Sequence, residues 1–101
     1  MKTKKFDSII DPGHGWLKVP CKLLCELGIT KNITPFSYVK GEYAYLEEDC
    51  DMSTFMNAMR EQRPDTEIKQ RTRHADRPSR VRNYPVYTPE YAERCGDDAN
   101  A

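Results

Sequence analysis

The sequence lacks long apolar runs and is poor in histidine and tryptophan. Its 101 residues are 38% hydrophobic and 32% charged, with two histidines and one tryptophan. No stretch approaches the roughly 20 apolar residues that a membrane-spanning helix needs. The basic residues at 2–5 lead into a short predicted strand rather than the apolar core of a secretory signal. We therefore expect one small cytoplasmic domain with no membrane contact.

Four cysteines are too few for a disulfide scaffold, and thiols in the cytoplasm stay reduced. Cys21 and Cys25 lie four residues apart in a predicted helix and share one face. Without a second short-range pair, this spacing gives little support for a closed zinc site. We expect both side chains to be buried as small hydrophobic groups, and we predict no cofactor.

The chain has no net charge, because 16 Lys and Arg residues balance 16 Asp and Glu residues. The whole molecule therefore has no long-range attraction for nucleic acid or anionic lipid. The charges are nevertheless unevenly distributed along the chain. Residues 60–82 hold eight basic and four acidic residues, whereas residues 83–101 hold one and four. A basic segment thus precedes an acidic end.

Turn and periodicity signals predict a strand, a second strand and a helix in the first third of the chain. Residues 6–10 and 16–19 read as strands joined through Asp-Pro-Gly, which is typical of a tight turn. Residues 20–27 form an apolar helical face that begins at Pro20. Gly28 and Ile29 then favour a Schellman-type helix end.

The middle of the chain repeats this arrangement. Residues 36–39 and 43–47 alternate around Lys40-Gly41-Glu42, which predicts a second hairpin. Asp51 is expected to cap a helix that ends before Pro64. The apolar residues of this helix recur at helical spacing and are expected to pack in the core, namely Met52, Phe55, Met56 and Met59.

These elements predict an α+β fold with the order ββαββα over residues 1–72, and residues 66–72 are a candidate for a fifth strand. Residues 73–101 are expected to form an extended tail, first basic and then rich in Tyr and Pro. Pro78, Pro85 and Pro89 argue against helix there, since proline restricts its own backbone and that of its predecessor. Residues 96–101 are expected to fray.

The first candidate site is the segment Ile10-Asp11-Pro12-Gly13-His14-Gly15. Asp11 can accept bonds from backbone N–H groups two residues on, so the segment makes an effective turn whatever His14 does. It resembles the opening motif of the zinc-dependent N-acetylmuramoyl-L-alanine amidases. That resemblance implies His14, Glu26 and His74 as metal ligands. A catalytic zinc needs three ligands in an open tetrahedral site, whereas this chain offers two dispersed histidines.

The second candidate is the acidic run Glu47-Glu48-Asp49-Cys50-Asp51. Clustered carboxylates can bind a hard cation or act in acid–base chemistry, but this spacing does not match a calcium loop. The alternative interpretation is a solvated surface that complements a helix dipole. If Asp11 and His14 fold beside this run, we expect a polar, convergent surface for a ligand or partner. The residues expected to bind there are Asp11, His14, Trp16, Glu47, Glu48 and Asp49.

The third candidate is the basic and aromatic arm of the C-terminal third. Arginines can contact phosphates and tyrosines can stack on bases, which is typical of single-strand binding. Arginine is also favoured at protein interfaces, so the preferred interpretation is docking on an acidic protein surface or on this protein's own acidic run. The residues expected to bind are Arg71, Arg73, Arg80, Arg82, Tyr84 and Tyr87.

Two long motifs resemble a group of small uncharacterised proteins of tailed bacteriophages and prophages. They are residues 11–20 (DPGHGWLKVP) and residues 44–51 (AYLEEDCD). The resemblance implies a phage accessory protein without an assigned activity. We therefore predict binding of a host or phage protein without catalysis. A zinc-dependent peptidoglycan hydrolase and a nucleic-acid-binding protein remain the alternatives.

Overall fold

A computed structural model of the protein describes residues 2–98. It contains a five-stranded mixed sheet with the strand order β3-β4-β2-β1-β5, which confirms the α+β class. The strands are β1 (Lys2–Ile10), β2 (Gly15–Pro20), β3 (Tyr38–Lys40), β4 (Tyr43–Glu47) and β5 (Thr66–His74). The helices are α1 (Cys21–Leu27), α2 (Asp51–Gln62) and α3 (Pro89–Asp98), with short 3-10 turns η1 (Thr30–Asn32) and η2 (Arg80–Asn83).

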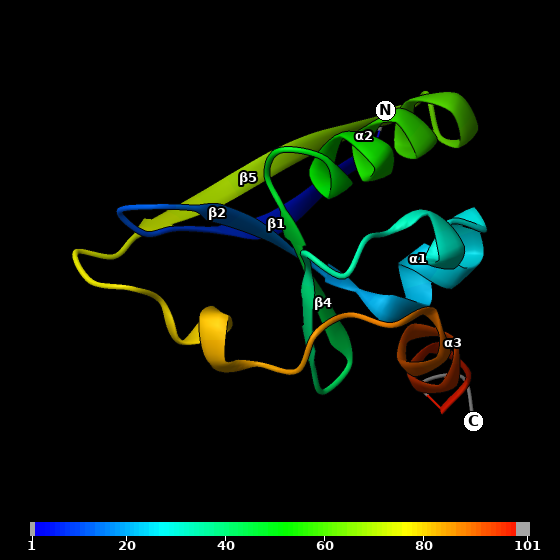
Figure 1. The fold of residues 1–101 in the computed structure, drawn as a ribbon. Coiled ribbons are helices and arrows are strands. Elements are labelled where there is room, and N and C mark those ends of the chain that lie inside the picture. The colour runs from blue at the N-terminus through cyan, green and yellow to red at the C-terminus, as the bar shows by residue number, and fades with distance from the viewer. Residues whose placement is uncertain (1, 99–101) are drawn as a thin grey trace.

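Both predicted hairpins are present. β1 pairs antiparallel with β2 across the 11–14 turn, and β3 pairs antiparallel with β4. Gly41 in the second turn has a φ of 60°, a conformation that residues with a side chain rarely adopt. β2 also pairs with β4, so the two hairpins form one continuous sheet (Figure 1).

Helix α1 ends as its sequence predicts. Gly28 has a φ of 71° and donates its N–H to the carbonyl of Cys25, while Ile29 donates to Leu24. These two bonds form the Schellman arrangement, which satisfies carbonyls at the helix end that would otherwise lack partners.

The candidate fifth strand is present and extends to His74. β5 lies parallel to β1 along its whole length, from Lys2 opposite Thr66 to Ile10 opposite His74. Ile68 is the large apolar side chain of β5, and it packs against the core from this edge position. The remaining side chains of β5 are mostly exposed, as expected for an edge strand protected by charge.

The main core lies between one face of the sheet and the three helices, which gather on one side of the molecule in Figure 1. Leu17 and Val19 point toward the helices, because alternate residues of a strand face opposite ways. The rings of Phe6 and Phe55 meet edge to face with centroids 5.3 Å apart. Met52 and Met56 pack against this cluster, which confirms the core assignment of the α2 stripe.

The expectation of an extended tail is wrong for residues 89–98, which form α3. Pro89 takes the first helical position, where its missing N–H costs nothing. The hydroxyl of Thr88 accepts from the N–H of Tyr91, so it caps the helix. The backbone of residues 96–98 continues α3 instead of fraying, and residues 99–101 lie outside the described residues.

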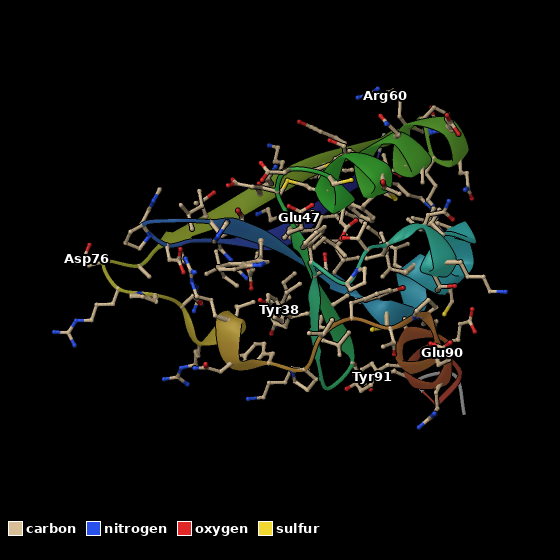
Figure 2. All side chains as sticks on the ribbon, in the orientation of Figure 1. Tyr38, Glu47, Arg60, Asp76, Glu90 and Tyr91 are labelled. Atoms are coloured by element: carbon tan, nitrogen blue, oxygen red, sulfur yellow. The ribbon has the colours of Figure 1, made fainter. Side chains whose placement is uncertain are left out.

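Helix α3 is bound to the domain through specific contacts. Tyr87, just before it, is buried, and its hydroxyl donates to the carbonyl of Thr30 at 2.6 Å. Tyr91 and Cys95 both donate to the carbonyl of Gly41 in the second hairpin turn. Figure 2 shows Tyr91 on α3 beside this hairpin. The C-terminal third therefore packs against the first two thirds.

The opposite face of the sheet carries a second, smaller core. The segment after β5 crosses this face before it reaches α3 (Figure 1). Val81 in η2 packs there with Trp16 and Tyr45, and Tyr38 and Tyr84 lie at its edge. None of the helices within residues 2–98 has both the length and the apolar composition needed to cross a lipid bilayer.

Candidate binding site

The 11–14 turn is fixed by the side chain of Asp11. Its Oδ1 accepts from the backbone N–H groups of Gly13 and His14 at 3.0 and 2.9 Å. The backbone N–H of Asp11 donates to the carbonyl of His14, which closes the turn. The sequence predicted this use of Asp11, since a short carboxylate can replace backbone partners in a turn.

Asp11 also attaches η2 to the turn. Its side chain is fully buried and forms a two-pronged ion pair with the guanidinium of Arg82, at 2.7 and 2.8 Å. The N–H of Ser79 donates to the same carboxylate. The hydrogen bond from Arg82 is the main reason why the pKa of Asp11 lies far below its ordinary value. Asp11 and Arg82, both predicted to bind a ligand or partner, therefore pair with each other instead.

The turn presents His14 at the surface beside Trp16. The two rings are tilted, with centroids 6.1 Å apart. Trp16 is only 2% exposed, and it meets Tyr38 edge to face while Arg82 lies over its ring. His14 therefore lies next to the Trp16 ring without stacking flat on it. Trp16 anchors the second core and offers a ligand only part of its ring.

The acidic run begins with Glu47, and this residue caps α2 in place of the predicted Asp51. Asp51 does not cap α2, because its carboxylate is buried and accepts from Thr34 and Ser37. Glu47 takes that role, and its Oε1 accepts from the N–H groups of Cys50 and Asp51 at 2.6 and 3.0 Å. Asp51 stands at the first helical position, where its side chain faces the 34–37 turn.

The turn and the acidic run converge on one cavity of about 340 Å³, as the sequence allowed. Three aromatic side chains, an imidazole, two carboxylates and a thiol line it, namely His14, Trp16, Phe36, Tyr38, Glu47, Asp49 and Cys50. We call these residues the aromatic–acidic pocket. Figure 2 labels Glu47 and Tyr38, which enter from β4 and β3. Glu48 is exposed and does not line the pocket.

Phe36 is the most exposed large apolar residue among those that the structure describes. It is 74% exposed, compared with 50% for Val86 and 37% for Tyr43. Exposed aromatic groups beside a hollow are a common feature of contact sites. The sequence predicts Phe36 and Tyr38 in one strand and assigns neither of them to a site. In the structure β3 begins at Tyr38, which comes beside Trp16 through strand pairing across β4 and β2, whereas Phe36 lies in the turn before β3.

The residues implied by the amidase resemblance do not come together. His14 lines the aromatic–acidic pocket, while Glu26 lies on α1 and pairs with Arg63 at 3.1 Å. His74 lies at the end of β5 and lines another hollow. Within residues 2–98, the ligand atoms that cluster closely belong to Glu47, Cys50 and Asp51. Glu47 and Asp51 already accept hydrogen bonds from the protein.

The predicted arm divides into surface and structural residues. Arg73, Arg80 and Tyr84 line one hollow on the sheet face opposite the helices, and Arg71 lines its neighbour. Arg71 also pairs with Asp7 at 2.7 Å. Tyr87 is 2% exposed and packs in the main core, so it is not part of that surface.

A scan of protein-family models and searches of curated proteins and solved structures found no significant match to this chain.

Proposed function

We propose that the protein is a small phage-type accessory protein that binds a host or phage protein without catalysis. The observation that carries this proposal is the aromatic–acidic pocket with the exposed ring of Phe36 at its margin. Aromatic residues are enriched among the few side chains that supply most of the binding energy at protein interfaces. A pocket of about 340 Å³ is at the small end of ligand sites, which favours one or two inserted side chains.

The chemistry of the pocket favours a basic side chain from the partner. The carboxylate of Asp49 is exposed and makes no hydrogen bond to other described side chains. A guanidinium or ammonium group beside it could form a charge-assisted bond and also contact the faces of the Phe36 and Tyr38 rings. His14, which also lines the pocket, is exposed and can rotate to accommodate the ligand.

Affinity capture with matched variants tests this proposal. We expect immobilised wild-type protein to retain a stoichiometric protein from bacterial lysate, whereas Phe36→Ala and Asp49→Asn lose it. Val86→Ala removes an exposed apolar side chain outside the pocket, and Glu48→Gln neutralises an acid beside it. Both control variants should retain the partner. Equal retention by all variants, or no stoichiometric partner, would contradict the proposal.

Trp16 offers a direct readout, because it is the single tryptophan of the chain and lines the pocket. The purified partner should change the Trp16 emission of wild-type protein and of Glu48→Gln. Agmatine, a small guanidinium compound, should compete for this change, whereas a neutral alcohol of similar size should not. Competition by both compounds would argue against recognition of a cation.

The metal-hydrolase alternative has less support. The two histidines line separate hollows, and an open catalytic zinc site needs three converging ligands. The nucleic-acid alternative has support from a different surface, which lies on the sheet.

A further inference from the structure

The sheet forks on the side of the molecule away from the 11–14 turn. β1 pairs with β2 only over residues 8–10 and 15–17, and the two strands then separate. β1 continues beside β5, while β2 remains paired with β4 and leads into α1. Figure 1 shows β1 and β5 running together toward α2 while β2 turns toward α1. The fork leaves room for a ligand between the two halves of the sheet.

A cavity of about 630 Å³ occupies this fork, and cations dominate its lining. The basic residues are Lys4, Lys5, Lys18, Lys22 and Arg71, and the carboxylates are Asp7 and Glu26. Both carboxylates are neutralised by ion pairs, Asp7 with Arg71 and Glu26 with Arg63. None of the four lysines forms a salt bridge within residues 2–98. The cavity therefore holds an excess of uncompensated positive charge.

A second cavity of about 520 Å³ continues the basic surface. It shares Asp7 and Lys18 with the first and adds Arg73, Arg80 and the tyrosines Tyr45 and Tyr84. We call the two cavities together the basic trough. It has no lining residue in common with the aromatic–acidic pocket. Because the molecule has no net charge, this local excess arises where the fold brings lysines of β1, β2 and α1 beside arginines of the basic 60–82 segment.

Two features of the basic trough favour an extended polyanion. Arg71 and Arg73 of the trough point to the same face of β5 as Lys69 just outside it, and alternate residues of a strand repeat about every 6.6 Å. This regular series of cations along an unpaired strand edge matches the regular phosphates of a nucleic acid. Two tyrosines beside it, Tyr43 and Tyr84, each hold a lysine ammonium over the ring, at 4.2 and 4.7 Å.

We infer that the basic trough binds single-stranded nucleic acid through its phosphates. Lys18 and Lys40 would move from the rings of Tyr43 and Tyr84 to the phosphates, which exposes the rings for stacking on bases. The rings of Tyr43 and Tyr84 can stack only on unpaired bases, which favours a single strand over a duplex. This inference goes beyond the protein-binding role and uses separate residues.

Fluorescence anisotropy with a labelled oligothymidylate of about twelve nucleotides tests the inference, and an oligouridylate of equal length compares RNA with DNA. We expect binding at low salt that weakens steeply as salt rises, because phosphate contacts release counterions. Lys18→Gln should weaken binding about fivefold and reduce the salt slope by about 0.7, the value for one lost single-strand contact. Arg73→Gln, in the second cavity, should act in the same direction.

Lys31→Gln is the matched control, because it removes one exposed lysine that lines neither cavity. It should bind like wild type, and circular dichroism should show that every variant is folded. The inference is overturned if Lys31→Gln weakens binding as much as Lys18→Gln, or if a duplex of equal length binds as tightly. Binding of polyglutamate in place of either oligonucleotide would instead identify an acidic protein as the ligand and overturn it too.

Discussion

Asp11 determines the conformation of the 11–14 turn and its attachment to η2. One buried carboxylate accepts from two N–H groups of its own turn, from the N–H of Ser79 and from both prongs of Arg82. A buried carboxylate needs such partners because burial without them is costly. Asp11, which the sequence predicts as a binding residue, therefore has a structural role. His14 remains the exposed side chain of the turn that is predicted to bind.

Asp11→Asn should destabilise the protein at neutral pH, because the neutral amide places an NH₂ group among donors that require an acceptor. The pKa of Asp11 is lowered from 3.8 in the folded state, so its ionised form stabilises the fold above that value. This stabilisation is lost progressively as the pH falls from 3.8 toward the lowered pKa of Asp11 in the folded state. Urea unfolding should thus show a large difference between wild type and variant at about pH 7 and a smaller one at about pH 3.

His14→Ala provides the control for that experiment. His14 is exposed, so the change should cost less than about 0.5 kcal/mol at either pH. A loss of structure in this variant would show that the imidazole, rather than the carboxylate, holds the turn.

At the scale of elements, helices α2 and α3 are each capped by a residue that lies before the helix and outside its apolar stripe. Glu47 lies at the end of β4, four residues before α2 begins at Asp51. Its carboxylate accepts from the N–H groups of Cys50 and Asp51. Thr88 caps α3, and Pro89 follows it at the first helical position. This second signal is present in the sequence, but the density of prolines favoured an extended interpretation. A proline that opens a helix and one that prevents it differ only in context.

Phe55→Ala should cost on the order of 3–5 kcal/mol in the free energy of unfolding, as expected for a fully buried aromatic ring. The ring meets Phe6 of β1, so its loss weakens the contact between α2 and the sheet. Denaturant unfolding measures the change. Asn57→Ala, on the exposed side of α2, should lie within about 0.5 kcal/mol of wild type. Similar losses in both variants would contradict the packing of α2.

At the scale of the whole molecule, one sheet supports two cores, and the protein presents two surfaces of opposite character. The larger core faces the helices, and the smaller one is closed by the segment that contains Val81. The acidic run lies beside the aromatic–acidic pocket, while the cations line the basic trough. A chain without net charge can therefore present local fields of either sign to different partners.

Thiol labelling reports whether α3 covers α1 in solution. All four cysteines are thiols, and Cys50 is exposed whereas Cys21 is buried under α3. Burial raises the pKa of Cys21 to about 12, which leaves little reactive thiolate at neutral pH. Cys50 should react first with Ellman's reagent, and Cys21 only when urea unfolds the protein. Rapid native labelling that mass spectrometry assigns to Cys21, rather than to the partly buried Cys25 or Cys95, would indicate that α3 leaves α1 uncovered.

The sequence by itself determined the local structures: both hairpins, the Schellman end of α1, the apolar stripe of α2 and the turn at Asp11. Each depends on neighbours a few residues apart, whose spacing fixes which way they face. Tertiary structure decided the parallel pairing of β5 with β1, the burial of Tyr87 and the joining of distant lysines and arginines in the basic trough. These features depend on contacts between segments far apart in the chain, and such contacts follow from how the complete core packs rather than from local periodicity.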